Sequence, residues 1–317
     1  MITDLKKKHF GALLGLAFDG NRLDGVVLRR TNGSVEIRKS FAVTLTLDLL
    51  KDDPELLGRE IRNRLDEAGI RERECVVGVP LDWALTLQTQ IPDLPESDVE
   101  SFLAIESERG FPYGLDALTI ACSRFNAAPN ENYATQVAVP RNNVARLERA
   151  LRSARLKPLS FSFGLTALHP PQAAESQGVV AIFIGEKSVF LLVTCGGGVA
   201  SLRTVETAFE AEVGVKRIFA DVLAREVRVT LGQLPAGVRE QLRTLRVFGS
   251  DEASHRLARE IQVRAEAMGL KVEHVSHYTG PQRGLKIQAS TTVSPALSLA
   301  VQHLSGQAPS FEFLPPR

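Results

Sequence analysis

The chain has 317 residues, of which 44% are hydrophobic and 24% are charged, and its formal net charge is +1. This length suits two lobes rather than one. The nearly neutral charge, with Lys and Arg scattered among Asp and Glu, gives no field that would concentrate a polyanion, which argues against nucleic acid as a main partner.

Cysteine usage and the lack of export or membrane patterns indicate a cytoplasmic chain. Cys75, Cys122 and Cys195 are far apart, odd in number and without a CxxC spacing, which fits a reducing compartment. No apolar run approaches the roughly 20 residues that span a bilayer, and the N-terminus lacks the pattern of an export signal. The lysines at 6–8 are interpreted as a solvated N-terminus rather than a lipid contact.

The first part of the chain predicts a strand meander, a helix and a buried strand. The meander strands are predicted at residues 12–17, 25–30 and 35–42, with turn signals between them. Asp53 and Pro54 then open a helix with apolar residues at helical spacing, and Gly69 ends it. The apolar run at 75–79 is typical of a central strand that is buried on both faces.

The middle of the chain, at about residues 84–137, is interpreted as an inserted small α+β subdomain. Its predicted elements are a strand at 85–91, a helix from Ser97 through Arg109, and strands at 117–125 and 133–139 around the polar loop NAAPNEN. Ser97 and Glu100 form a capping box for the helix. A helix at 141–156 follows, before a lobe boundary in the loop that contains His169.

The second half of the sequence repeats the order of elements in the first half. Strands are predicted at 179–184, 188–194 and 199–205, then a long helical region from Ala208, a strand at 245–248, a helix at 252–268 and a strand at 271–275. Such a repeat indicates a duplicated α/β fold with a ligand cleft between the lobes. The lobes are predicted at residues 1–165 and 172–304, with 305–317 as a tail or linker.

One stretch of the middle block carries a family resemblance. The segment IPDLPESDVESFLAIESERGFPYGLDAL is similar to the PilM family of pilus and secretion proteins, with Glu106, Glu108, Arg109, Phe111 and Pro112 at its distinctive positions. Four further segments fall in the order found in PilM-like proteins: LLGLAFDGNRLDGVVL, VVGVP, VVAIFIGEKSVFLLV and TVSPALSLAVQHLSG. The resemblance implies an actin-like (ribonuclease H-like) two-lobe fold, with a reduced insertion in the second lobe.

The resemblance also locates a nucleotide cleft. In actin-like ATPases two Gly-turn hairpins cradle phosphates, and an Asp in each holds hydrated magnesium or orients the attacking water. Ala17 and Phe183 stand at these two positions, near the turn glycines Gly20 and Gly185. A single Gly249 stands where a Gly-Gly turn packs on adenosine. We expect a degenerate cleft without catalytic residues, bound metal or cofactor.

Alternatives to an empty cleft stay open. In one alternative, the hairpin register is shifted and Asp19 or Asp24 supplies one of the missing carboxylates. The chain would then be an actin-like protein that binds ATP with magnesium. A protein that binds something else between its lobes is a third possibility. The glycines at 196–198 lack the Lys and Ser or Thr of a phosphate loop and predict a hairpin. His274 and His277 lack further ligands for a metal.

The last ten residues, APSFEFLPPR, resemble the short I-N-L-L-P motif of PilN, the membrane protein whose tail docks on PilM. Phe311, Phe313 and Leu314 would fill apolar pockets while Pro315 keeps the segment extended, and a docked tail should reach the first lobe. An unstructured terminus is the alternative.

The family resemblance implies a partner and a cellular place as well as a fold. It implies a non-catalytic scaffold on the cytoplasmic face of the bacterial inner membrane, in a type IV pilus or a related secretion platform. Its expected partners are a PilN-like membrane protein, or its own membrane-proximal tail, and other proteins of the platform. A similar motif also stands between a PilM-like domain and a membrane helix in one polypeptide.

Overall fold

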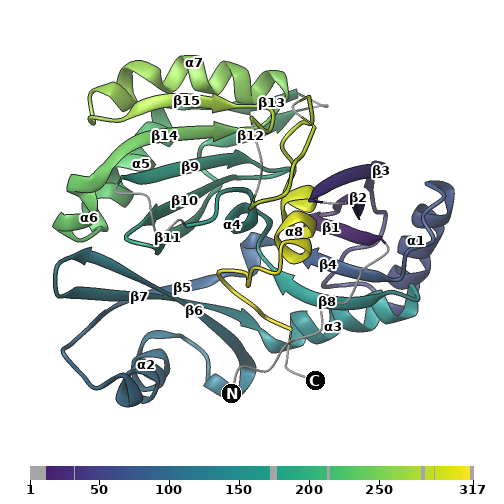
Figure 1. Cartoon of the computed structure of the whole chain (residues 1–317), viewed down its shortest axis with the longest axis horizontal. Coiled ribbons are helices and arrows are strands. Elements are labelled where there is room, and N and C mark those ends of the chain that lie inside the picture. The colour runs from purple at the N-terminus through teal and green to yellow at the C-terminus, as the bar shows by residue number, and fades with distance from the viewer. Residues whose placement is uncertain are drawn as a thin grey trace.

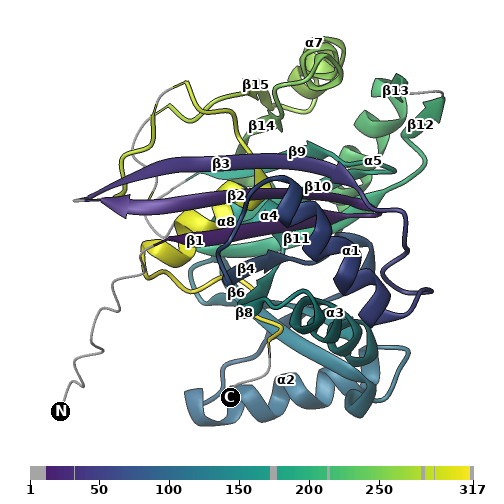
Figure 2. The same cartoon turned by 90° about the vertical axis from the view of Figure 1, so that its right-hand side faces the viewer.

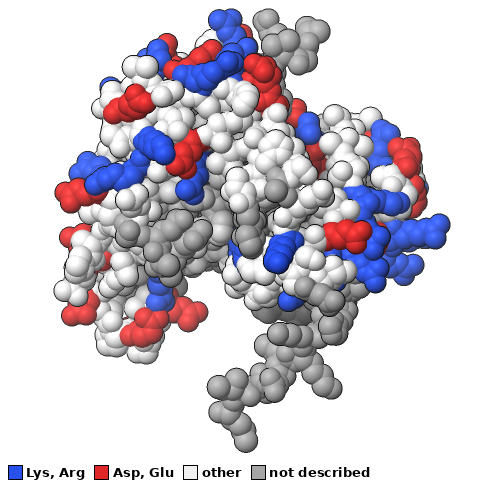
Figure 3. All heavy atoms as spheres, turned by 45° about the horizontal axis from the view of Figure 1, so that its top comes forward, with Lys and Arg blue, Asp and Glu red and all other residues white. Residues whose placement is uncertain are grey.

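Two five-stranded sheets, one from each half of the chain, form two lobes in the computed structural model, with a three-stranded sheet beside them (Figure 1). The structure describes residues 12–31, 33–171, 177–212, 215–279, 283–288 and 290–314. Lysines 6–8 and Pro315 lie outside this part of the chain. On the face seen in Figure 3, basic and acidic side chains lie near one another at several places, as expected from Lys and Arg residues scattered among Asp and Glu along the sequence.

The first-lobe sheet has the strand order β3-β2-β1-β4-β8. Its strands are β1 (Leu13–Asp19), β2 (Arg22–Thr31), β3 (Ser34–Thr44), β4 (Glu74–Gly78) and β8 (Lys157–Ser162). Helices α1 (Pro54–Glu67) and α3 (Arg141–Ser153) pack against each other on one face (Figure 2). The Asp53 side chain accepts hydrogen bonds from the first two free N–H groups of α1, which confirms the predicted start of that helix.

The second-lobe sheet has the equivalent order β11-β10-β9-β14-β15. Its strands are β9 (Gly178–Ile184), β10 (Val189–Cys195), β11 (Gly198–Val205), β14 (Leu242–Phe248) and β15 (Lys271–Val275), and its helices are α5 (Ala220–Gln233), α6 (Ala236–Gln241) and α7 (Glu252–Glu266). In the first lobe β1 pairs antiparallel with β2 and parallel with β4. In the second lobe β9 pairs in the same way with β10 and β14. The predicted internal repeat is therefore confirmed.

The inserted block forms its own small sheet with the order β5-β7-β6. Its elements are β5 (Leu85–Ile91), α2 (Glu96–Gly110), β6 (Leu118–Ala128) and β7 (Glu131–Pro140). Val99 and Leu103 of α2 pack with Ile91 and Ala134 of the sheet in a separate small core. The predicted capping box does not form, because α2 begins after Pro95 and the Ser97 hydroxyl donates to Asp98 instead.

Several segments predicted as loops or helices form other elements in the structure. The polar loop around residue 129 is reduced to a tight turn, because β6 and β7 pair as far as Ala128 and Glu131. The region after Ala208 begins with the hairpin β12 (Phe209–Glu212) and β13 (Val215–Ile218) rather than a helix, with Phe209 paired to Ile218. Strand β8 and the short helix α4 (Gly164–Leu168) occupy what the sequence predicts as a loop.

Helix α8 (Pro295–Leu304) packs on the first lobe, although the predicted boundary of residues 172–304 assigns it to the second. It contacts β1, β2 and β4 on the sheet face opposite to α1 and α3 (Figure 2). Gly15 of β1 makes the approach possible, because a Cβ atom there would lie 2.2 Å from the Ala296 carbonyl oxygen. The apolar residues of α8 therefore complete the core of the first lobe.

Candidate functional site

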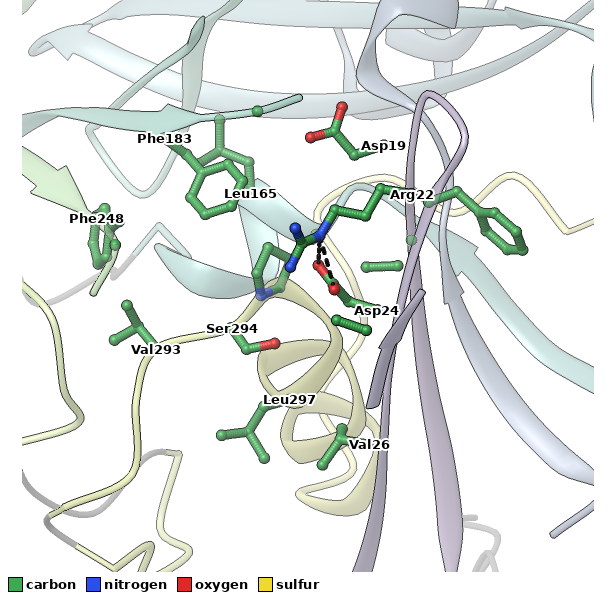
Figure 4. A pocket seen from close by; sticks show the side chains of 18 of the residues that line it. Asp19, Arg22, Asp24, Val26, Leu165, Phe183, Phe248, Val293, Ser294 and Leu297 are labelled. Atoms are coloured by element: carbon green, nitrogen blue, oxygen red, sulfur yellow. Dashed lines mark hydrogen bonds and ion pairs between the residues drawn. The ribbon is translucent and has the colours of Figure 1, made fainter. Parts of the chain in front are cut away.

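A cavity of about 610 Å³ lies between the two lobes. Its walls include the ends of β1 and β2 that flank their turn, the β9–β10 turn, the β14–α7 turn and the start of α8, and Figure 4 draws some of these side chains. Of the residues predicted for a degenerate nucleotide cleft, those that line it are Ala17, Asp19, Phe183, Gly185 and Gly249. Gly20 lies in the β1–β2 turn with a φ of 56°, outside the lining. The fold thus brings segments from both halves of the repeat to one cavity.

Asp19 and Asp24, the two carboxylates that would replace the lost metal ligands, both line this cavity. The Oδ2 atom of Asp19 accepts a hydrogen bond of 2.8 Å from the backbone N–H of Glu186 in the opposite hairpin. A Cβ atom at Gly185 would lie 2.7 Å from the same oxygen, so glycine at this position permits the close approach. Asp19 therefore connects the two hairpins across the cleft.

Arg22 forms ion pairs with two acidic side chains, Asp24 and Glu186, at the same edge of the cavity. Its Nε atom lies 3.0 Å from Oδ1 of Asp24, a contact that Figure 4 draws, and its Nη1 atom lies 3.1 Å from Oε1 of Glu186. Burial acts to lower the pKa of Arg22, but the charges of Asp24 and Glu186 outweigh it, so the pKa is raised. The guanidinium therefore stays charged and ties the two lobes together.

Aromatic rings occupy the wall where an actin-like ATPase would hold its second carboxylate. The Phe183 ring stacks on Phe190, with 6.5 Å between ring centroids and 7° between the ring planes. Phe248 lines the cavity on the same side as Phe183, away from Asp24 (Figure 4). A phenyl ring cannot ligate a metal, and Ala17 has no ligand atom either. The residues at the two hairpin positions therefore do not fit hydrated magnesium.

The C-terminal segment lies along β8, the open edge of the first-lobe sheet. The backbone N–H of Phe313 donates to the carbonyl of Phe161 at 2.9 Å. The Glu312 carboxylate accepts from the Phe161 backbone N–H at 2.8 Å and from the Ser160 hydroxyl at 2.6 Å. One acidic side chain and one backbone group thus satisfy part of an edge that would otherwise face water.

Apolar side chains fix the same segment on the lobe. Phe311 and Phe313 are 1% and 0% exposed, and their rings lie 6.2 Å and 5.0 Å from the Phe163 ring in edge-to-face arrangements. Leu314 is half-buried against the first-lobe core. Of the residues predicted to bind a partner, these three therefore lie in a groove of their own chain. We call the surface formed by β8 and Phe163 the tail groove.

His169 is buried where the chain passes from the first lobe to the second. Its Nε2 atom lies 3.0 Å from the Thr194 hydroxyl, and its ring lies 5.9 Å from the Phe248 ring. Burial, together with the charge of Arg246, lowers the pKa of His169 to about 3. The imidazole is therefore neutral at physiological pH, and it contacts Thr194 and Phe248 of the second lobe as an uncharged ring.

This burial predicts a pH dependence of stability. An unfolded histidine titrates with a pKa of about 6.5, so below that pH the unfolded chain binds a proton that folded His169 does not. We expect the free energy of unfolding to fall from about pH 6.5 down to about pH 3, by about 2 kcal/mol at pH 5. Urea unfolding at several pH values checks this. His169→Gln should remove that part of the dependence, and identical profiles for both proteins would contradict the prediction.

The residues that sequence reasoning missed act through contacts between distant segments. Arg22 and Glu186 are 164 positions apart, and Glu312 and Phe161 are 151 apart. No local pattern signals an ion pair at such a separation. For Glu312 the alternation Phe-Glu-Phe is a signal, since it predicts an extended segment with two apolar side chains on one face.

Solved structures with the same fold are known. The chain is similar to a structure of the PilM-PilN type IV pilus biogenesis complex, with 20% identity, a TM-score of 0.67, and coverage of 95% of this chain and 100% of that one. It is also similar to the cytoplasmic domain of EpsL, an inner-membrane component of the type II secretion system of Vibrio cholerae, with 13% identity, a TM-score of 0.53, and coverage of 94% and 97%. No family model and no curated protein matches the sequence.

These likenesses extend over nearly the whole chain and show its fold. The duplicated two-lobe α/β architecture is that of PilM, which confirms the predicted actin-like fold. Within the described ranges, the structure contains no helix that is both long and apolar enough to cross a membrane.

Proposed function

We propose that this protein is a non-catalytic scaffold at the inner membrane, in a type IV pilus or a related secretion platform. The two similar structures support the class: one is a complex of PilM with PilN, and the other is the cytoplasmic domain of an inner-membrane component of a secretion system. The protein would lie on the cytoplasmic face, held there by a PilN-like membrane protein or by its own membrane-proximal tail, and would bind other platform proteins.

The observation that carries the proposal is the occupied tail groove. Phe311 and Phe313 bury their rings, while Glu312 binds both the backbone and a hydroxyl of β8. An extended peptide that adds to a sheet edge and fills alternate pockets is a common mode of peptide recognition. The groove is therefore suited to a short segment of this pattern, whether it comes from the same chain or from a PilN-like partner.

The structure of the inter-lobe cavity supports a role without catalysis. Ala17 and Phe183 offer no metal ligand, and Asp19 already accepts a hydrogen bond from the opposite hairpin. A magnesium nucleotide would have to displace that contact and the ion pairs of Arg22 before it reached a carboxylate. This cost favours a cleft that holds the lobes together over one that turns over ATP.

An actin-like ATP-binding protein with a rearranged site is the second candidate, and one observation favours it. Asp19 and Asp24 both line the cavity, so two carboxylates lie within the cleft despite the replaced positions. A ligand other than a nucleotide in the same cavity, for which the aromatic wall offers apolar contacts, is a third candidate.

Calorimetric titration with ATP and magnesium separates these candidates. The scaffold predicts no saturable heat up to about millimolar nucleotide, the weakest range in which titration detects binding. Saturable binding at micromolar concentration that Asp19→Ala or Asp24→Ala abolishes would contradict it and establish the rearranged site. A parallel assay of phosphate release tests hydrolysis directly, and Glu312→Ala, far from the cavity, serves as the control variant.

A further inference from the structure

Two histidine rings face each other on the second lobe. His255 lies in the first turn of α7, and His274 lies near the end of β15. Their Nδ1 atoms are 3.0 Å apart, their ring centroids 4.3 Å apart, and their planes differ by 52°. Two nitrogens that bind the same tetrahedral zinc ion are roughly 3.3 Å apart, since each lies about 2.0 Å from the metal. The pair is thus close to the separation of two ligands on one ion.

Hydrogen bonds behind His274 fix which of its nitrogens carries the proton. The Ser254 hydroxyl is fully buried and donates to the Asp251 carbonyl at 2.8 Å, so its oxygen accepts from the His274 Nε2 atom at 3.4 Å. With Nε2 protonated, the neutral ring presents the lone pair of Nδ1 toward His255. Such supporting hydrogen bonds orient metal-binding histidines in known sites.

We propose that His255 and His274 together bind one divalent transition-metal ion, with zinc as the test case and water completing its coordination. Imidazole nitrogens favour zinc, nickel and copper over magnesium. His255 is exposed and His274 is half-buried, so the ion has an open path from solvent. Among the residues that the structure describes, no third His, Cys, Asp or Glu stands in ligand position, which makes this a two-residue site.

The position of the pair gives the metal a structural consequence. It would join α7 to β15, and Ser254 behind His274 donates a hydrogen bond to Asp251 of the β14–α7 turn. Gly249 and Asp251 of that turn line the inter-lobe cavity. Metal binding would therefore stiffen one wall of the cavity from outside, without a ligand inside it.

Titration of the untagged full chain with zinc chloride at about neutral pH tests the inference. We expect one saturable site, with at least a tenfold loss of affinity in His255→Ala and in His274→Ala, and about a tenfold loss in Ser254→Ala. His277→Ala is the matched control, since His277 is exposed, its Nδ1 atom lies 2.9 Å from the Ser276 hydroxyl, and its loss should leave zinc binding unchanged. Magnesium chloride should give no saturable heat.

A second measurement keeps the result independent of heat signals. Zinc should raise the melting temperature of the wild-type protein and of His277→Ala, and raise it less in His255→Ala and His274→Ala. Circular dichroism confirms that each variant is folded. No saturable binding, or binding that survives both substitutions, would overturn the proposal and leave an ordinary hydrogen bond between two neutral imidazoles.

Discussion

Phe313→Ala is expected to lower the free energy of unfolding by about 3 kcal/mol, since truncation of a buried Phe removes its transfer energy and leaves a cavity. Phe313 is 0% exposed and its ring contacts Phe163 edge to face at 5.0 Å. If the tail of the variant detaches from the first lobe, the loss of unfolding free energy is limited to the free energy with which the tail docks. Urea unfolding measures the total, and hydrogen exchange of the Phe161 and Phe313 amides shows whether the tail has left β8.

Two further substitutions, with smaller expected losses of stability, serve as comparisons for Phe313→Ala. Leu314→Ala removes a half-buried side chain from the same segment and should cost about 1 kcal/mol. Val263→Ala removes a side chain that is 74% exposed on α7 and should change stability by less than about 0.5 kcal/mol. Equal stability of Phe313→Ala and the wild-type protein would show that the tail groove is not filled in solution.

Gly15→Ala is expected to cost about 2 to 3 kcal/mol, in the range of overpacked cores. The added Cβ atom would lie 2.2 Å from the Ala296 carbonyl and 3.0 Å from the Ala300 side chain, so β1 and α8 must separate. Neither partner yields easily, because one contact is backbone and both segments are buried. Thermal and urea unfolding both measure the loss.

Gly232→Ala is the matched control for this prediction. Gly232 lies in α5, and nothing stands within 4 Å of the position its Cβ atom would take. Alanine there should leave stability unchanged or raise it by up to about 1 kcal/mol, because it has the higher helix propensity. If Gly15→Ala were as stable as Gly232→Ala, the close packing of α8 on the first lobe would be wrong.

Local signals in the sequence were enough to predict those elements whose bounds depend on neighbouring residues in the chain. Asp53 and Pro54 begin α1 as predicted, and Gly69 follows its end with a φ of 67°. The strand predicted at 85–91 is β5 to the residue, and the repeat of two meanders is found in both sheets. Caps, turns and periodic apolar residues act over a few positions, so they can be read without the fold.

Elements decided by distant partners were not predictable in this way. Strand β8 contains Pro158, which argues against a strand, yet the register with β4 shifts between Cys75 and Val76 and accommodates it. Helix α8 has no sequence feature that assigns it to one lobe, and its packing on β1, β2 and β4, with Gly15 at the closest approach, does so. The hairpin of β12 and β13 likewise depends on pairing rather than on propensity.

In the candidate site, too, some positions were predictable from the sequence and others depended on contacts between distant segments. The positions of Ala17, Phe183 and Gly249 in one cavity follow from the family resemblance and the repeat. The contacts that fill the cleft, from Arg22 to Glu186, join segments 164 positions apart. The pairing of His255 with His274 also needs the fold, because a helix and a strand bring the two rings together.

Binding of the tail as a separate peptide tests whether the tail groove of the first lobe holds a short extended segment. The measurement is calorimetric titration of a chain that ends at Gly306 with the peptide QAPSFEFLPPR. We expect saturable one-to-one binding that is lost when the residue equivalent to Phe313 is alanine. If the shortened chain is unstable alone, we expect the peptide to restore its cooperative unfolding. A folded, shortened chain that does not bind the peptide, or an unstable one that the peptide fails to restore, would contradict this expectation.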